Sequence, residues 1–343
     1  MENKKKIKLL DVSKKAGFST TTVSQALNNV KTARISPESR AKILETAKEL
    51  GYVPDQLARS LVLGKTNIIG LVISGFISPF STPFYSEFIR GVGLSLEKNN
   101  YYLLIIEPKK DDSLEEIYAK TAGNRLIEGL IIDGNYIKDS FIIRLNKENY
   151  PFVVSGREIP GIKINCVTQD YYNGAYNATK YFIKKEHKNI CFIGGPNNTE
   201  MTNLIDREIG YREALKDNSL IIREELMLNS NDITIEEGYR LMNKVLSFSS
   251  KTTAVLAAND LLAIGAMNAI KEHKLNIPGD IAVIGFDDFP ESSIISPKLS
   301  TLKYDLLKNG ETLGDLLIEF IKNKNISKNI VMQPSLIIRE SSG

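Results

Sequence analysis

The stretch KLLDVSKKAGFSTTTVSQALNN, residues 8–29, decides the architecture of the N-terminal part of the chain. Its first half predicts a short helix over Leu10–Ala16 that ends at Gly17, a residue suited to the left-handed conformation just after a helix. Ser19 is then expected to cap a second helix by accepting a hydrogen bond from the backbone N–H of Thr22. Two helices joined by a tight glycine-containing turn form a helix-turn-helix.

The second helix of this motif carries the side chains that we expect to read DNA. Val23 and Leu27 predict its buried face, because residues four apart lie on the same side of a helix. Thr20, Thr21 and Gln25 point away from that face, and the start of the second helix is the part that meets base edges in the major groove. Threonine offers a hydroxyl and a methyl group, and glutamine pairs bidentately with adenine. The alternative is that the threonines only cap the helix.

A third helix is expected after the motif. Ser36, Pro37 and Glu38 form a start signal, with a cap, a proline at the first helical position and an acid in the first turn. Apolar residues then recur at helical spacing, at Ile43, Leu44, Ala47 and Leu50. Gly51 ends the helix, and three short helices suit a small DNA-binding headpiece.

The charge distribution separates this headpiece from the rest of the chain. Residues 1–65 hold 10 Lys and 3 Arg against 2 Asp and 4 Glu, whereas the remainder holds 31 basic and 35 acidic residues. A basic module attached to a mildly acidic body is typical of a nucleic-acid binder with a second task. A solvated basic tail is the alternative interpretation of the charge alone.

Several other classes of protein are disfavoured by the composition. No apolar run approaches the roughly 18 residues of a membrane-spanning helix, and the first residues, MENKKKIKLL, lack the apolar stretch of a secretory signal. Cys166, Cys191, His187 and His273 form neither a disulfide framework nor a metal-ligand pattern. We therefore expect a cytoplasmic protein without a membrane association, a metal or another cofactor.

The acidic body alternates buried strands with amphipathic helices. Apolar runs that predict strands lie at residues 68–74, 102–107, 129–133, 151–155, 190–195, 253–259 and 281–288. This alternation predicts doubly wound parallel sheets with helices on both faces. The body is too long for one comfortable core, so two lobes with a cleft between them are expected.

Residues 8–29, together with ISPESRAKILETAKELGYVPDQLARSLVLGKTNIIGLVIS at 35–74, resemble the lac/gal repressor family of bacterial transcription regulators. The resemblance covers essentially the whole chain and implies a core like that of periplasmic binding proteins. The implied domains are a headpiece at 1–54, a hinge helix and linker at 55–66, an N-terminal lobe at 67–168 with 303–328, and a C-terminal lobe at 169–302 with 329–343. The chain would cross between the lobes near residues 168, 302 and 329.

The resemblance also implies a set of DNA contacts. Residues 55–63 would form a hinge helix that orders on the operator and pairs with its twin in a dimer, and Leu61 would enter the minor groove as an apolar wedge. The full set implied for DNA is Thr20, Thr21, Thr22, Ser24, Gln25, Asn28 and Leu61. The family usually has arginine where this chain has Gln25, so the preferred operator is expected to differ from the commonest family sequence.

An effector site in the cleft is implied as well. Arg207, Asn259 and Asp287 match the polar ligand-binding positions of the family, and Phe84 with Tyr85 matches an aromatic wall from the other lobe. Arginine donates, aspartate accepts, and asparagine does both, which suits a sugar or polyol. The alternatives are a surface ion pair for Arg207, a turn cap for Asp287, and plain core packing for the two aromatic residues.

The remaining candidates in the cleft are Ser74, Arg157 and Ile233. Ser74 stands at a strand end. Ile233 replaces the aromatic platform of many sugar-binding members, and Gly156 with Arg157 follows the strand where many members have aspartate. Arg157 would favour an anionic or phosphorylated ligand.

The sequence thus predicts a ligand-responsive, sequence-specific repressor of carbohydrate-utilisation genes. The resemblance implies a double-stranded DNA operator and a sugar or sugar derivative as effector. A homodimer is expected, because PSLIIRESSG lacks the leucine-rich tail by which some members of the family tetramerise. The same role under the control of a partner protein or a non-sugar ligand is the alternative. A remote alternative is an α/β enzyme, although ICFIGGPNN is neither GxGxxG nor a P-loop and no catalytic set stands out.

Overall fold

The computed structural model describes residues 7–28, 33–53, 65–73, 83–109, 111–124, 126–134, 137–195, 202–248 and 251–343. Leu61, the predicted hinge helix and Ser74 lie outside the described residues, so their roles stay predictions. The chain divides into two compact units, Met1–Asn67 and Ile68–Gly343, and each is described by itself.

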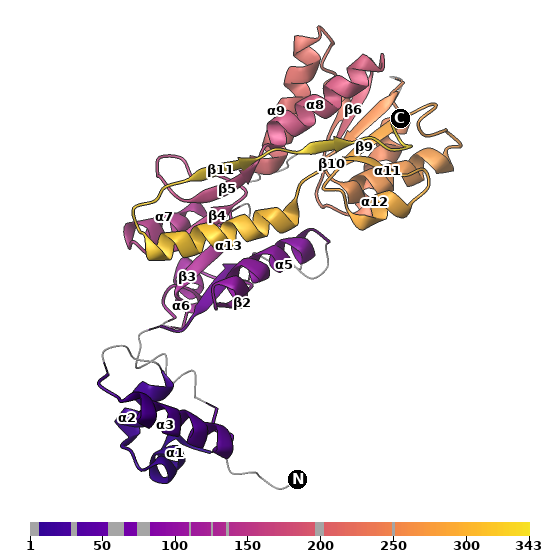
Figure 1. The fold of residues 1–343 in the computed structure, drawn as a ribbon. Helices are drawn as coiled ribbons and strands as arrows, with labels where there is room; N and C mark the ends of the chain where they lie inside the picture. The colour runs from indigo at the N-terminus through magenta and orange to yellow at the C-terminus, as the bar shows by residue number, and fades with distance from the viewer. Residues whose placement is uncertain are drawn as a thin grey trace. The chain divides into compact units, whose positions relative to one another are not determined.

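The described residues of the first unit form three helices, α1 (Leu9–Ala16), α2 (Thr20–Leu27) and α3 (Pro37–Leu50) (Figure 1). Small and branched apolar side chains fill the space between them, namely Val12, Ala16, Val23, Ala26, Ile43 and Ala47. Gly17 and Gly51 end α1 and α3 in the left-handed conformation, with φ of 78° and 66°. The predicted three-helix headpiece is confirmed.

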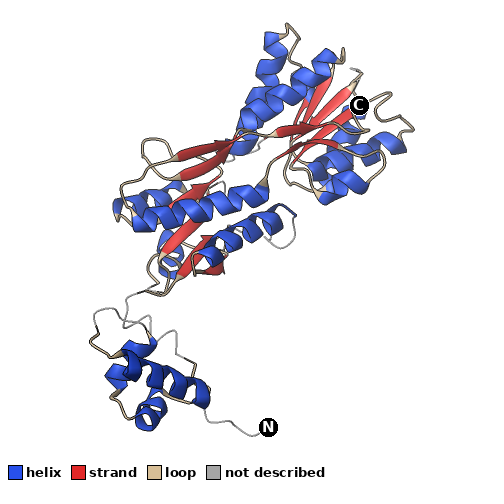
Figure 2. Cartoon of the chain, viewed as in Figure 1, coloured by secondary structure: helices blue, strands red, loops and turns tan. Residues whose placement is uncertain are grey.

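The second unit contains two six-stranded sheets, each flanked by helices (Figure 2). The first sheet runs in the order β11-β5-β4-β3-β1-β2 with all strands parallel. Its strands are β1 (Ile68–Val72), β2 (Tyr102–Ile106), β3 (Gly129–Asp133), β4 (Phe152–Ser155), β5 (Cys166–Gln169) and β11 (Asn329–Met332). Helices α5 (Pro83–Lys98) and α13 (Leu306–Lys322) pack on one face, and α6 (Leu114–Lys120) and α7 (Asp139–Lys147) belong to the other.

The second sheet runs in the order β12-β10-β9-β8-β6-β7. Its strands are β6 (Ile190–Gly195), β7 (Met227–Asn229), β8 (Ala254–Ala257), β9 (Ala282–Phe286), β10 (Ser300–Lys303) and β12 (Ser335–Ile337). Its helices are α8 (Tyr171–Lys184), α9 (Thr202–Asp217), the short 3₁₀ helix η1 (Glu224–Leu226), α10 (Ile235–Leu246), α11 (Asp260–Glu272) and α12 (Pro290–Ile294). The pairings are parallel except that the edge strand β12 runs antiparallel to β10.

The chain passes between the two sheets three times. The first passage follows β5, and the second follows β10. The third differs from the sequence prediction, because 329–332 forms β11 and pairs with β5 in the first sheet before the chain reaches β12. The assignment of all of 329–343 to the C-terminal lobe is therefore wrong by the length of this strand.

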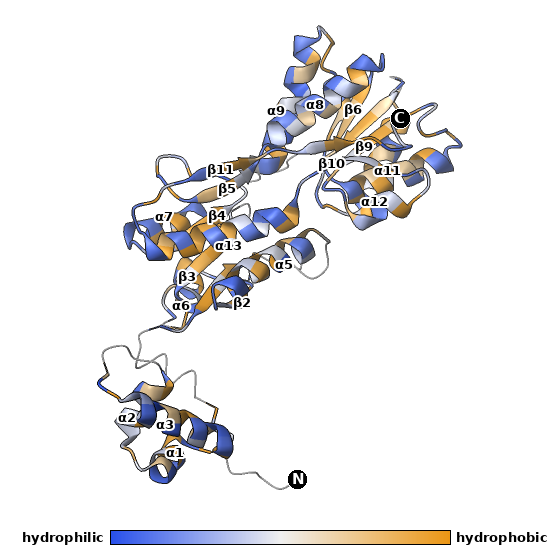
Figure 3. Cartoon of the chain, in the orientation of Figure 1, coloured by the Kyte–Doolittle hydropathy of each residue, from blue (hydrophilic) through white to orange (hydrophobic). Residues whose placement is uncertain are grey.

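Most of the central strands of the two sheets are apolar, and the polar residues lie mainly on the outer sides of the helices (Figure 3). This arrangement is the one that alternating βα units require, because both faces of a central parallel sheet are covered. Within the described ranges, no helix is long and apolar enough to cross a membrane.

Candidate DNA-reading helix and effector site

The start of α2 is built as the sequence predicts. Ser19 has extended backbone angles, and its hydroxyl oxygen accepts a hydrogen bond from the Thr22 amide at 3.1 Å. The hydroxyl of Thr22 lies 2.8 Å from that of Ser19, so Thr22 takes part in the cap. Phe18 packs against the headpiece core beside this turn, where it fixes the direction in which the chain enters α2.

The side chains of α2 that are predicted to contact DNA differ in their exposure to solvent and in their hydrogen bonds within the helix. Thr20 and Thr21 are exposed, and Gln25 is half-buried. The side-chain nitrogen of Asn28 donates to the hydroxyl of Ser24 at 3.3 Å. The two residues lie one turn apart on the same side of α2. Thr20, Thr21 and Gln25 therefore remain the candidates for base contacts, and Ser24 with Asn28 forms a pair next to them.

Arg40 on α3 supports the end of α2, which sequence reasoning did not foresee. Its guanidinium donates to the carbonyl oxygen of Ala26 at 3.2 Å. Lys42 on the same helix places its ammonium group 5.8 Å from the centre of the Phe18 ring. Both contacts join residues far apart in the chain, so no local spacing signals them.

Arg207 on α9 is the centre of the candidate effector site and is only 4% exposed. Its guanidinium carbon lies 4.7 Å from the ring centre of Tyr171 and 4.6 Å from that of Phe286, so the charged group is held between two aromatic rings. One terminal nitrogen donates to the carbonyl oxygen of Ala258 at 2.7 Å. The interpretation of Arg207 as a surface ion-pair residue is wrong, because the side chain is buried.

Gly210, one turn after Arg207, lets α9 approach α8 closely. A Cβ atom at this position would lie 2.2 Å from the carbonyl oxygen of Tyr172, far inside contact distance. The glycine therefore allows the separation at which Arg207 reaches the ring of Tyr171.

Asp287 follows β9 and faces Arg207. Its backbone is left-handed, with φ of 97°, and its amide donates to the carbonyl oxygen of Leu302 at 2.8 Å. One carboxylate oxygen lies 3.5 Å from a terminal nitrogen of Arg207. Burial raises the pKa of Asp287 to about 6, and the Arg207 guanidinium opposes the rise.

Asp260, which sequence reasoning missed, anchors the segment after Asp287. Its carboxyl group accepts hydrogen bonds from the Phe289 amide at 2.8 Å, the Ser292 hydroxyl at 2.6 Å and the Thr301 hydroxyl at 2.6 Å. Burial raises the pKa of Asp260 to about 8. The only local signal was its position directly after Asn259.

Asn259 has a structural task beside the one predicted for it. Its side-chain oxygen accepts a hydrogen bond from the Leu262 amide at 2.9 Å and so caps α11. The residue is 5% exposed and lies directly after Ala258, whose carbonyl oxygen receives Arg207. The structure thus brings Arg207, Asn259 and Asp287 to one end of the second sheet.

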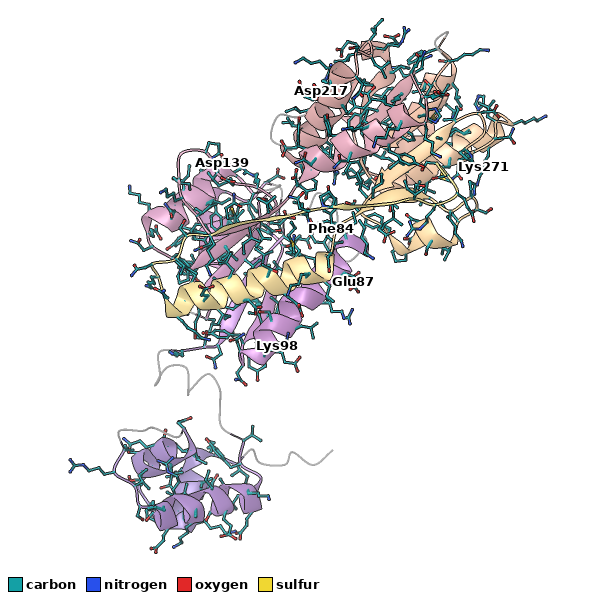
Figure 4. The ribbon with its side chains drawn as sticks, turned by 45° about the horizontal axis from the view of Figure 1, so that its top comes forward. Phe84, Glu87, Lys98, Asp139, Asp217 and Lys271 are labelled. Atoms are coloured by element: carbon teal, nitrogen blue, oxygen red, sulfur yellow. The ribbon has the colours of Figure 1, made fainter. Side chains whose placement is uncertain are left out.

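The first lobe contributes aromatic residues from the start of α5. Phe84 is partly buried and packs against the hydrophobic cores of both lobes. Figure 4 shows Phe84 at the end of α5 that adjoins the second lobe, with Lys98 at the opposite end. The Tyr85 hydroxyl donates to the buried carboxylate of Asp133 at 2.6 Å. Asp133, the last residue of β3, was not among the sequence candidates.

Arg157 is held by its own lobe. Its guanidinium donates to the carbonyl oxygens of Gly134 at 2.5 Å and Ile137 at 3.0 Å, and it forms an ion pair with Asp139 at 2.5 Å. The expectation that Arg157 favours an anionic ligand therefore loses its basis, because the charge is already compensated. Ile233 is half-buried just before α10, and no described contact joins it to Arg207, Asn259 or Asp287.

The glycines at the end of β6 are the one hint of a phosphate-binding enzyme, and Gly194 has a packing explanation. Gly194 has φ of 103°, a conformation that favours glycine. A Cβ atom there would lie 2.6 Å from the Cβ of Ala258. The strand therefore turns tightly against the neighbouring strand end.

Comparison with known proteins agrees with this architecture. Residues 8–55 match the model of the bacterial regulatory proteins of the lacI family, and residues 179–342 match a periplasmic binding protein-like domain. A probable HTH-type transcriptional repressor of Bacillus subtilis, ExuR, is 32% identical over 337 residues, which cover 98% of each chain. The chain belongs to the lacI family of bacterial regulatory proteins.

Solved structures show the same fold over nearly the whole chain. The lac repressor dimer bound to operator and the anti-inducer ONPF has a TM-score of 0.85 at 25% identity, covering 98% of this chain and 99% of that one. A complex of the transcriptional regulator CelR with cellobiose has a TM-score of 0.75 at 26% identity, covering 98% and 100%. The protein is a DNA-binding transcriptional repressor of the lacI family, whose members are regulators and not enzymes.

Proposed function

We propose that this repressor binds as a homodimer to a roughly palindromic operator in the genes of carbohydrate utilisation. Thr20, Thr21 and Gln25 of each protomer read the half-sites. They lie outside the apolar face of α2, which packs on α1 and α3, so their side chains are available to DNA. Gln25 favours adenine at the position it contacts. Leu61 is proposed as the minor-groove wedge on the strength of the family resemblance alone.

The second part of the proposal is a small carbohydrate effector bound beside Arg207, Asn259 and Asp287, with Phe84 as the wall from the first lobe. The observation that carries it is the buried Arg207–Asp287 pair, with the Arg207 guanidinium between two aromatic rings. The pair lies at the carboxyl ends of the strands, where open α/β sheets bind ligands. The related CelR structure, which contains cellobiose, supports the same class of ligand.

The effector would control the repressor through the two lobes. A ligand changes DNA affinity only if it binds two states of the protein with different affinity. Contacts to Arg207 and Asp287 in the second lobe and to Phe84 in the first would favour one arrangement of the lobes. A coupling of about 1–3 kcal/mol, which is typical, would change operator affinity by roughly 5- to 150-fold.

A thermal-shift screen of sugars on the full-length protein tests the proposal, because a ligand of the folded state raises its stability by mass action. An operator is obtained by selection from random DNA, and the stabilising sugar is then titrated against the labelled complex. Asp287→Asn is the informative variant, since asparagine tolerates a positive φ better than alanine does. It should abolish the response to the sugar and leave sugar-free operator affinity nearly unchanged.

Asp217→Ala is the matched control. Asp217 is exposed at the far end of α9, where it accepts a hydrogen bond from Tyr176 at 3.0 Å. This variant should respond to the sugar like the wild type. An Asp287→Asn protein with a normal response would show that Asp287 only shapes the turn and that the signal enters elsewhere.

A further inference from the structure

We infer that the effector is an uncharged polyhydroxylated molecule and that its phosphorylated and carboxylated counterparts are excluded. The inference rests on the proposed function and narrows its ligand class. It follows from how the cationic side chains around the candidate site are already paired and from which polar atoms are left.

The charge of Arg207 is compensated in place. Asp287 lies 3.5 Å away, and the side chains of the two residues are only 5% and 9% exposed. The faces of the guanidinium are covered by Tyr171 and Phe286. An anion that approached Arg207 would also meet the carboxylate of Asp287, and like charges at such a distance in a buried site repel each other strongly.

Three other cationic side chains near the ends of strands, Arg157, Arg339 and Lys303, are paired with carboxylates as well. Arg157 is bound to Asp139 and to two carbonyl oxygens of its own lobe. Arg339 and Lys303 both pair with Asp288, at 2.6 and 3.4 Å.

Two buried polar atoms near Asp287 remain without a hydrogen-bond partner in the described part of the chain, and they are suited to bind the hydroxyl groups of a ligand. The Arg207 Nε atom and the Tyr304 hydroxyl oxygen are buried and have no hydrogen-bond partner among the described residues. Tyr304 is 4% exposed, and burial raises the pKa of its phenol, which therefore keeps its proton. The ring centre of Tyr304 lies 5.4 Å from that of Tyr171, one of the two rings that hold the Arg207 guanidinium.

A sugar hydroxyl can bind both the hydrogen-bond acceptor and the hydrogen-bond donors of this site. It donates a hydrogen to the Asp287 carboxylate and accepts one from Arg207 Nε or from Tyr304. A fully ionised phosphate or carboxylate group only accepts, so such a group placed beside Asp287 offers its carboxylate no hydrogen. The site therefore distinguishes a neutral polyol from an anion by hydrogen bonding as well as by charge.

The test uses matched ligands on the full-length protein at pH 7.5. Thermal shifts are compared for glucose, glucose 6-phosphate and glucuronate, for galactose and galacturonate, for ribose and ribose 5-phosphate, and for cellobiose. We expect an uncharged sugar to raise the midpoint of unfolding and its charged counterparts to leave it unchanged. A charged member that stabilises the protein as much as its neutral counterpart overturns the inference while the carbohydrate proposal stands.

If no sugar in either form stabilises the protein, the proposed carbohydrate effector falls and this inference falls with it. Asp287→Asn adds a second arm, because it removes the repelling charge and the acceptor together. We expect it to lose at least tenfold in affinity for the uncharged sugar and to gain a thermal shift with the charged counterpart. Glu224→Gln removes one of the two acidic partners of Arg212, which is on α9 like Arg207, and should behave like the wild type.

The wild-type protein at pH 5 replaces the variant if Asp287→Asn does not fold. Burial raises the pKa of Asp287 to about 6, so the carboxyl is mostly protonated at pH 5 and Arg207 is left uncompensated. The titratable groups around it are Arg207 on α9, Asp260 on α11 and Tyr304 after β10. Binding of glucuronate or a sugar phosphate should appear at pH 5 and be absent at pH 7.5. Equal exclusion at both values contradicts the role of the Asp287 charge.

Discussion

Gly210→Ala should destabilise the core and disturb the effector site together. The added Cβ would lie 2.2 Å from the carbonyl oxygen and 3.0 Å from the carbonyl carbon of Tyr172, and 3.1 Å from the amide nitrogen of Tyr176. These are backbone atoms of α8, which no rotamer change can move. Since nonbonded heavy atoms rest roughly 3.5 Å apart, α8 and α9 must separate by about 1 Å.

The net cost follows from two opposing effects. Overpacking of a close helix pair costs about 1–3 kcal/mol, and replacing a glycine inside a helix by alanine returns up to about 1 kcal/mol. We therefore expect a net loss of about 1–2 kcal/mol in the free energy of unfolding. Arg207 lies one turn before Gly210, so the same displacement moves its guanidinium away from Tyr171 and should weaken the response to the sugar.

Urea unfolding followed by far-ultraviolet circular dichroism measures the effect, at one protein concentration for all variants. Gly93→Ala is the control, because Gly93 is also inside a helix but an added Cβ would meet no heavy atom within 4 Å. It should stabilise the protein by about 0.5–1 kcal/mol. A Gly210→Ala protein as stable as Gly93→Ala would show that α8 and α9 do not depend on this close approach.

Ser19→Ala should lower headpiece stability by about 1 kcal/mol and Ser19→Gly by less, measured by amide exchange at the start of α2; equal protection in all three proteins would contradict the cap. Gln25→Ala should cost about 1–3 kcal/mol on the selected operator and little on random DNA, and equal losses on both in a binding assay would make Gln25 a backbone contact. The free energy of unfolding should fall as pH rises from about 4 to 8, because the folded Asp260 carboxyl keeps its proton to a pKa of about 8 while the unfolded one loses it earlier. A pH series of urea unfolding on wild type and Asp260→Asn checks this, and an equally steep fall in the variant would assign it to other groups.

The headpiece and the repeating core could be predicted from local patterns in the sequence. Ser19 as a cap and Gly17 as a helix end follow from interactions within a few residues, and the structure confirms both. The central strands were visible for a similar reason, because a strand buried on both faces is a continuous apolar run. The strands β5 and β10 and the edge strands β7, β11 and β12 were missed, because they have three or four residues each and lack such a run.

Only the tertiary structure decided how the candidate site is assembled. The pairing of Arg207 with Asp287 joins residues 80 positions apart, and the anchoring of Thr301 on Asp260 joins residues 41 apart. Arg157 reads in the sequence as a free cation beside a strand end, yet the fold neutralises it with Asp139. Such contacts depend on where parallel strands bring their carboxyl ends together, and the spacing of residues along one segment carries no record of that.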